Sequence, residues 1–288
     1  MYGDSEELLG SVGAGDKFLI DTKVMSWEPG SHAKDTILKE INASLEALKI
    51  KQINAEYLHI PDRATPFEEP CEAMDIAFKA GKIREWGLSN FSAEEVEEIC
   101  QICESKGWIK PTVYQGQYNP ICRSGEGPLF PVLRKHGLRF YAFSPAAGGF
   151  FVGSHKAPVP GGRFDTSVRY CGIPSLNRVL TAAHWKHHVG KRYATMYDKP
   201  LLIAVGDKAL RVVAKHGIDG HAAALRWTVH HSALKPDFGD AVIVGVSSME
   251  QLNRASEAIQ AGPLPVEVAQ ALDSIYEQSG EDKVPYHL

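Results

Sequence analysis

The feature that most constrains the fold is a regular alternation of short apolar runs with longer amphipathic stretches. Within residues 33–48, the apolar side chains of Ile37, Ile41, Leu45 and Leu48 recur at spacings of four, four and three, which places them on one face of a helix. Strands that alternate with such helices are typical of a parallel sheet whose two faces are covered. The sequence therefore predicts an α/β fold.

We expect strands at residues 17–24, 55–59, 84–88, 112–115, 139–143 and 241–246. We expect helices at residues 33–48, 67–80, 93–103, 129–136, 175–188, 200–216, 221–231, 249–260 and 266–278. Ser92 and Glu95 have the spacing of a capping box, so the third helix begins directly after a short loop. Six strands in 288 residues predict a single domain, residues 1–288, with a (β/α)8 TIM barrel that lacks its first units. An open α/β sheet is the alternative.

Charge and composition argue against several classes of partner. The chain has 31 Lys and Arg against 35 Asp and Glu, a net charge of -4, so we expect no nucleic-acid partner. No apolar run approaches the length of a membrane span and no leader peptide is recognisable, so we expect a cytoplasmic protein with no membrane partner.

The cysteines and the paired histidines do not have the spacing of metal sites. Five cysteines are an odd and sparse set, which argues against a disulfide framework. Cys100 and Cys103 fall in a helical pattern, and we expect buried thiols there rather than a zinc site. Adjacent residues on a helix point about 100° apart, so the pairs at 187–188 and 230–231 are poor metal ligands. We expect no metal.

Eight segments in the order of the chain carry a resemblance to a known family. They are MYGDSEELLG, IDTKV, EYLHIPDRATPFEE, AGKIREWGLSNFSAEEV, KPTVYQGQYNPI, LRFYAFSPAAGG, ALRWTVHHS and GVSSMEQL. Together they resemble the aldo-keto reductases, in particular the aflatoxin-aldehyde-reductase type. The resemblance implies an aldo-keto reductase barrel with NADPH across its carboxyl-end face, and reduction of an aldehyde or ketone to an alcohol. It also implies a small-molecule carbonyl substrate and, from fungal relatives, a place in secondary metabolism; monomer and homodimer both stay open.

The resemblance assigns three catalytic residues. Tyr2 matches the general acid, Lys23 the lysine that lowers the pKa of that tyrosine, and His59 the histidine that orients the carbonyl. The family's aspartate, five residues before the tyrosine, has no counterpart in the sequence. Without a carboxylate partner, a lysine in a low-dielectric pocket loses its proton more readily. The alternatives are a frayed terminal residue for Tyr2, a solvent-reaching lysine for Lys23 and a core histidine for His59.

The residues that the resemblance assigns to the nicotinamide are Ser89, Asn90, Gln115 and Phe143, the last as a stacking partner. In the loop of residues 144–154, it assigns the pyrophosphate to Ser144, Pro145, Gly148 and Gly149, since glycine permits close backbone approach. This loop departs from the family at Ala146 and at Gly153-Ser154, where the family has Leu and Gly-Lys. Lys156 or Arg163 is expected to replace the missing lysine. Ordinary turn and core packing is the alternative for these residues.

A second anion site is expected after the last strand. Ser247 and Ser248 precede a helix, whose free N–H groups and dipole favour an anion. Gln251 and Arg254 follow one turn apart, and a guanidinium there suits the 2′-phosphate of NADP rather than NAD. Ala255 replaces the family's asparagine at the adenine contact. An ordinary capped surface helix is the alternative.

Two other hypotheses compete with the reductase. The missing aspartate favours a non-redox barrel, such as an isomerase or a ligand-binding or regulatory protein. The sequence is also consistent with a gene model begun at an internal methionine, and hence with a fragment that does not fold alone.

Overall fold

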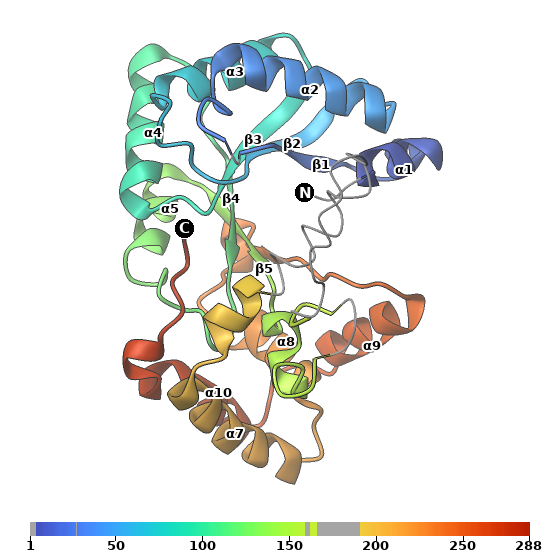
Figure 1. Cartoon of the computed structure of the whole chain (residues 1–288), viewed down its shortest axis with the longest axis vertical. Coiled ribbons are helices and arrows are strands. Elements are labelled where there is room, and N and C mark those ends of the chain that lie inside the picture. The colour runs from blue at the N-terminus through green and yellow to red at the C-terminus, as the bar shows by residue number, and fades with distance from the viewer. Residues whose placement is uncertain (1–3, 27, 159–161, 166–190) are drawn as a thin grey trace, which may run out of the picture. The chain divides into compact units, whose positions relative to one another are not determined.

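The computed structural model describes residues 4–26, 28–158, 162–165 and 191–288 (Figure 1). The chain divides into two compact units, which we describe separately. The sheet unit consists of the described residues within Tyr2–Gly116, Gly127–Tyr141 and His287–Leu288. The helical unit consists of those within Gln117–Glu126 and Ala142–Tyr286.

The described residues form one six-stranded sheet. Its strands are β1 (Asp21–Val24), β2 (Ile53–Leu58), β3 (Ile83–Ser89), β4 (Val113–Gln117), β5 (Arg139–Phe143) and β6 (Ala241–Val242), and they are hydrogen-bonded in sequence order. β1 to β4 pair in parallel. The expected α/β class with parallel strands is therefore confirmed.

Amphipathic helices connect the strands of the sheet unit. They are α1 (Ser5–Ser11), α2 (Lys34–Leu48), α3 (Glu68–Lys79), α4 (Ala93–Lys106) and α5 (Leu129–His136). On α2, Ile37 and Ile41 are fully buried and Leu48 is 2% exposed, so the face predicted from the spacing is the one that packs inward. Figure 1 shows α2, α3 and α4 lying along the sheet unit on the outer side of its first strands.

The capping box at the start of α4 is confirmed. The Glu95 backbone N–H donates to the Ser92 hydroxyl at 3.3 Å, and the Ser92 backbone N–H donates to the Glu95 carboxylate at 2.8 Å. The helix therefore begins three residues after Asn90, which fixes the loop that follows β3.

The helical unit contains α7 (Pro200–Lys215), α8 (Gly220–His230), α9 (Met249–Gln260) and α10 (Val266–Gln278). α7 and α10 lie side by side (Figure 1) and bury apolar residues such as Leu202 and Leu272. Residues 191–197 are also helical. Short 3₁₀ segments among the described residues of the two units are η1 (Ala14–Asp16), η2 (Ala147–Val152), η3 (Pro236–Phe238) and η4 (Gly280–Asp282). In this unit β5 and β6 meet through the Ile243 backbone N–H, which donates to the Ala142 carbonyl at 2.8 Å.

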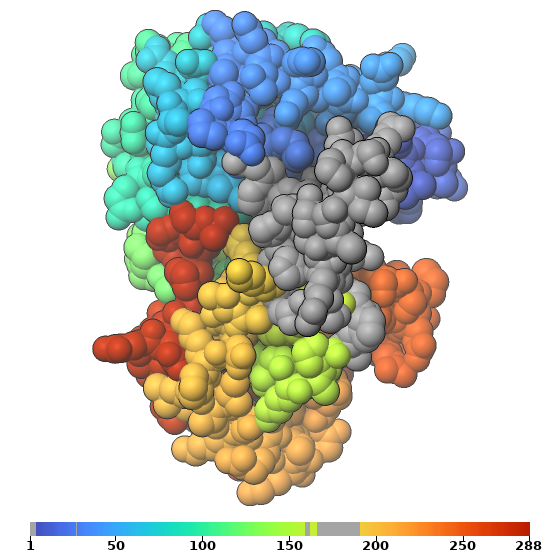
Figure 2. Space-filling model, in the orientation of Figure 1, coloured from blue at the N-terminus to red at the C-terminus, as the bar shows by residue number. Residues whose placement is uncertain are grey.

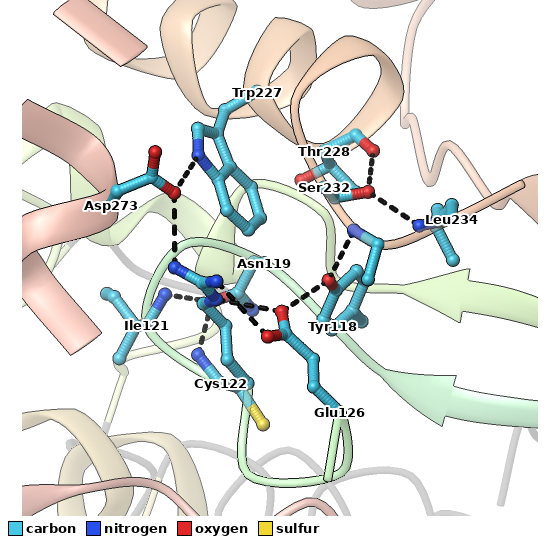
Figure 3. A network of polar contacts seen from close by, with 12 residues as sticks. Tyr118, Asn119, Ile121, Cys122, Glu126, Trp227, Thr228, Ser232, Leu234 and Asp273 are labelled. Carbon is cyan, nitrogen blue, oxygen red and sulfur yellow. Dashed lines mark hydrogen bonds and ion pairs between the residues drawn. The ribbon is translucent and has the colours of Figure 1, made fainter. Parts of the chain in front are cut away.

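A network of polar contacts joins α8 and α10 to the segment that follows β4 (Figure 3). Arg123 pairs with Glu126 at 2.8 Å and with Asp273 at 3.1 Å. The indole N–H of Trp227 donates to the same Asp273 carboxylate at 3.0 Å, and the Tyr118 hydroxyl donates to Glu126 at 2.6 Å. The network fixes the residues just past the end of β4.

The first and last strands were predicted too long. The first strand begins at Asp21 rather than at residue 17, because Phe18 and Leu19 lie outside the sheet and are 69% and 67% exposed. The last strand is only Ala241–Val242, because Val246 and its neighbours lie in an exposed segment that leads into α9. Helix α1 was not predicted from the sequence. The helix expected at residues 175–188 lies outside the described residues.

The described thiols are buried. Cys100 and Cys103 are fully buried on α4, as expected, and Cys71 on α3 is equally buried. The described cysteines, which exclude Cys171, are free thiols. Within the part of the chain that the structure describes, no helix is both long and apolar enough to cross a bilayer.

Candidate active site

The carboxyl ends of β1 to β4 bring several predicted site residues to one edge of the sheet unit. Lys23 on β1 pairs in register with Tyr57 on β2. His59 directly follows Leu58, whose partner on β3 is Leu88, the residue before Ser89. Ser89 pairs with Gln115 on β4. Parallel strands place their carboxyl ends together, so these side chains share the edge where ligands bind in α/β folds.

Lys23 is half-buried on β1, near an aromatic ring and two carboxylates. Its Nζ atom is 5.3 Å from the centroid of the Tyr57 ring. Burial lowers the pKa of Lys23 from its ordinary value of 10.5, while the charges of Asp21 and Glu56 raise it. Desolvation is the larger effect, so the amine is held less firmly in its charged form than a surface lysine.

His59, Ser89 and Asn90 are buried and linked to one another. The Asn90 side-chain amide donates to the His59 carbonyl at 2.8 Å and to the Ser89 hydroxyl at 3.1 Å. Asn90 has a φ of 67°, in the left-handed region that asparagine tolerates better than most residues. A rigid, strained position of this kind is common at functional sites. The structure therefore brings these three predicted residues together.

In the helical unit, Phe143 ends β5 and is half-buried, and the loop that follows is tied down by side chains from distant segments. The Asn119 amide donates to the Ser144 carbonyl at 3.0 Å, and the Thr228 hydroxyl donates to the Pro145 carbonyl at 3.0 Å. The Ser144 hydroxyl lies 2.7 Å from the Tyr193 hydroxyl. The loop is thus held in place by contacts that do not involve a ligand.

The two glycines of this loop both have positive φ angles, 63° at Gly148 and 100° at Gly149. A Cβ atom at Gly148 would lie 2.3 Å from Cε1 of Tyr193, and one at Gly149 would lie 2.7 Å from the Ser154 hydroxyl. The chain's own packing therefore requires glycine at both positions. From the sequence, we expected glycine at these positions because it lets the pyrophosphate approach the backbone closely. The packing within the chain is a second, separate reason.

The two cations expected to replace the family's loop lysine have partners within the chain. Lys156 forms an ion pair with Asp207, with Nζ 2.5 Å from one carboxylate oxygen. Arg163 is exposed, and its guanidinium lies 5.8 Å from the centroid of the Tyr193 ring. Of the two, Arg163 is the one without a carboxylate at ion-pair distance among the described residues.

The predicted second anion site lies at the amino end of α9, a helix exposed along most of its length (Figure 2). Ser248 caps it by accepting a hydrogen bond from the Gln251 N–H at 3.2 Å. The Gln251 side chain accepts from the Ser247 N–H at 2.9 Å. Arg254 pairs with Glu250 at 2.6 Å and is 75% exposed, so its guanidinium lies beside a carboxylate that an anionic ligand would have to outcompete.

The remaining predictions concern Tyr2 and the paired histidines. Tyr2 and the 187–188 pair lie outside the described residues. His230 lies 3.1 Å from the Ile259 carbonyl, and His231 accepts a hydrogen bond from the Leu264 N–H at 2.7 Å, so both rings have structural partners. Within the described ranges, no cluster of three or more potential ligand side chains is arranged to hold a metal ion.

Comparison with known proteins now identifies the chain's relatives. The sequence model of the aldo/keto reductase family matches residues 1–277. The chain belongs to the aldo/keto reductase family. It is therefore an oxidoreductase that acts on carbonyl compounds, and the family's fold is the (β/α)8 barrel, in agreement with the sequence prediction.

Curated members of the family match almost the whole chain. The chain is 40% identical to aflatoxin B1 aldehyde reductase member 2 of Homo sapiens over 283 residues, which are 96% of this chain and 76% of that protein. It is 35% identical to oxidoreductase sirO of Leptosphaeria maculans, over 99% of this chain and 82% of that protein. Aldo-keto reductase pigE of Monascus ruber is 31% identical over 84% of this chain and 67% of its own length.

The donor set of this aldo/keto reductase fits the nicotinamide nucleotide that the family generally uses. At the edge of the sheet unit, Ser89, Asn90 and Gln115 offer one hydroxyl and two amides, which match both donors and acceptors of a carboxamide. In the helical unit, the first turn of α9 offers backbone N–H groups and Arg254 offers a guanidinium. Each unit, taken by itself, therefore offers groups of the kind that this cofactor requires.

Sequence reasoning missed the residues that support this site. Asn119, Tyr193 and Thr228 hold the loop after β5, and Tyr57 lies under the Lys23 amine. Each acts on a residue far away along the chain, so no local motif identifies it. The one available signal was the parallel register, which places Tyr57 opposite Lys23 once both strands are predicted.

Proposed function

We propose that the chain reduces an aldehyde or ketone to an alcohol with NADPH as the hydride donor. The observation that carries the proposal is the row of Lys23, His59, Ser89, Asn90 and Gln115 at one edge of the sheet unit in a member of the aldo/keto reductase family. When bound, the nicotinamide supplies the hydride. The chain must then supply a proton to the carbonyl oxygen and hold the substrate in place.

Tyr2 is proposed as the proton donor. A tyrosine has a pKa of about 10 in water, so it gives up its proton reluctantly near neutral pH. A nearby ammonium stabilises the phenolate and lowers that pKa, and Lys23 is the proposed ammonium. The charged form of Lys23 is thus the functional one, although burial lowers the pKa of its amine.

His59 is proposed to orient the substrate oxygen. The residue is 9% exposed at the end of β2, and its carbonyl accepts from Asn90. Packing around a residue with so little exposed surface limits rotation of its ring, so the ring favours one approach of the carbonyl.

The proposed cofactor contacts fall in three groups. Ser89, Asn90, Gln115 and Phe143 hold the nicotinamide. Ser144, Pro145, Gly148, Gly149 and Arg163 hold the phosphates. Ser247, Ser248, Gln251 and Arg254 hold the adenosine end, with Arg254 selecting NADP over NAD through the 2′-phosphate.

The substrate is proposed to be a small-molecule aldehyde or ketone, encountered in fungal secondary metabolism. Support comes from a relative named as an aldehyde reductase and from fungal relatives in Leptosphaeria maculans and Monascus ruber. These names describe those proteins, and they guide the choice of test compounds for this one.

The test is a binding titration with NADPH followed by a single-turnover experiment with a panel of aldehydes, monitored at the nicotinamide absorbance band. We expect binding, and oxidation of bound NADPH by at least one aldehyde. Binding without oxidation across the panel would contradict the reductase and favour a ligand-binding protein.

A variant at the proposed acid sharpens this test. Tyr2→Phe removes the transferable proton and leaves the ring, so we expect turnover to fall at least 100-fold, a typical contribution of acid catalysis, with NADPH affinity unchanged. The affinity is the control in the same titration. A variant that retains full rate would show that the proton comes from another group.

A further inference from the structure

We propose that Tyr57 and Asp21 are positioning residues that keep the Lys23 amine protonated, Tyr57 through the face of its ring and Asp21 through its carboxylate. The reason why this charge matters rests on the proposed function. The protonation of Lys23, by contrast, is a property of the chain that can be measured without turnover.

The first argument is the geometry of Lys23 and Tyr57. The two residues are direct partners in the β1–β2 register, so their side chains leave the same face of the sheet. The Lys23 Nζ atom lies 5.3 Å from the ring centroid, within the distance of about 6 Å at which a cation is attracted by an aromatic face. The ring therefore favours the charged form of the amine.

The Tyr57 ring is fixed in this position. It is fully buried, and a Cβ atom at Gly87, its register partner on β3, would lie 2.7 Å from Cε1 of the ring. Glycine at position 87 therefore makes room for the ring. Burial raises the pKa of the Tyr57 phenol far above its ordinary value, so this residue stays neutral and acts through its ring rather than as a phenolate.

Asp21 acts electrostatically on the same amine from its own strand. Side chains alternate along a strand, so Asp21 and Lys23, two residues apart on β1, share a face. Asp21 also accepts a hydrogen bond from the Asn54 side-chain amide at 2.7 Å, which limits its freedom. Because Asp21 is exposed, water screens its charge and the effect on Lys23 is moderate.

The charged and titratable groups that act on Lys23 come from both strands. Asp21 on β1 and Glu56 on β2 raise its pKa, and burial lowers it. Glu56 leaves β2 on the opposite face from Tyr57, and burial raises its own pKa well above the ordinary value, which favours its neutral form. Among the described residues named here, Asp21 and the Tyr57 ring are the ones that act on the amine from its own face.

The experiment measures the pKa of Lys23 directly in the full chain. Each variant is treated with trace acetic anhydride over a range of pH, and acetylation of Lys23 is followed by mass spectrometry with exposed Lys39 as the internal reference. Because only the neutral amine reacts, the midpoint of the curve is the pKa of Lys23. No substrate or cofactor is needed.

The variants separate the ring from its hydroxyl. Tyr57→Phe keeps the ring face and removes only the buried hydroxyl, so we expect an unchanged midpoint. Pentafluorophenylalanine at position 57 has a similar shape but a reversed ring quadrupole, so we expect the midpoint to fall by about 0.5 to 1 unit. Asp21→Asn is expected to lower it as well.

The outcomes are distinct. Equal midpoints for Phe and pentafluorophenylalanine at position 57 would overturn the role of the ring, and an unchanged midpoint in Asp21→Asn would overturn that of the carboxylate. Both Tyr57 variants are close in size to the natural residue, which protects the comparison from misfolding. If the midpoints shift as expected while no aldehyde is reduced, the proposed function fails and this inference stands. If turnover is intact and the midpoints do not move, this inference alone fails.

Discussion

At the scale of single residues, the most unusual group in the sheet unit is Glu56. Its side chain is 1% exposed on β2, and neither carboxylate oxygen has a hydrogen-bond partner among the described residues. Burial raises its pKa well above 4.5, and the nearby carboxylates of Glu6 and Glu40 raise it further. A buried carboxyl group of this kind destabilises the fold whenever its ionised form is favoured in the unfolded chain.

Replacing Glu56 with Gln should stabilise the protein in a pH-dependent way. Because the pKa is higher in the folded state, the natural chain loses stability as the pH rises above the unfolded value of about 4.3, by about 1.4 kcal/mol per pH unit until the folded pKa is reached. Glu56→Gln removes this loss. Urea unfolding should therefore show little difference near pH 4 and a growing advantage for the variant toward pH 7.5.

Glu46→Gln, at an exposed position on α2, is the matched control. Its stability relative to the natural chain should not change in this way with pH. A stability difference for Glu56→Gln that stays constant from pH 4 to pH 7.5 would mean that Glu56 does not titrate abnormally in the folded chain.

At the scale of elements, the loop after β5 depends on glycine for two separable reasons. Gly148 and Gly153 both have positive φ angles, of 63° and 79°. A Cβ atom at Gly148 would also collide with Tyr193 at 2.3 Å, whereas nothing lies within 4 Å of one at Gly153. Gly153→Ala should thus lower the free energy of unfolding by about 1 to 2 kcal/mol through backbone strain alone.

Gly148→Ala should cost more than this control, by a further 1 to 3 kcal/mol, because the Tyr193 ring must move. The two variants are compared by chemical unfolding under identical conditions. Equal losses would show that the loop yields to the extra methyl group and that the contact with Tyr193 is not restrictive.

The same scale shows what local sequence patterns can and cannot predict. The bounds of α5, α9 and α10 were predicted to the residue because apolar spacing and their flanking residues mark both ends. Helix α1 was missed because it has only seven residues, too few for a clear period, and most of its residues are exposed. The apolar run at Phe18 and Leu19 was taken for part of a strand, although its side chains face solvent. Apolar character alone therefore does not distinguish a buried strand from an exposed approach to one.

At the scale of the whole molecule, the predictable part of the candidate site consists of residues that lie at the ends of predicted strands. Lys23, His59, Ser89 and Gln115 each follow or end a strand, and the parallel topology then brings them together. The supporting contacts were not predictable, because they join residues separated by 25 to 83 positions, such as Asn119 with Ser144 and Pro145 with Thr228. Such pairs depend on register and on packing that no local pattern records.

The thermal stability of the whole chain offers a test of cofactor choice that needs no substrate. A ligand that binds the folded state at 100 times its Kd stabilises it by about 2.7 kcal/mol, so cofactor affinity can be read from the melting temperature. If Arg254 holds the 2′-phosphate, NADP should raise the melting temperature of the natural chain more than NAD does. Arg254→Ala should remove most of that difference, while Arg211→Ala, an exposed arginine on α7, should leave it intact. Equal reductions of the NADP and NAD shifts in Arg254→Ala would mean that the guanidinium contributes to binding without recognising the phosphate.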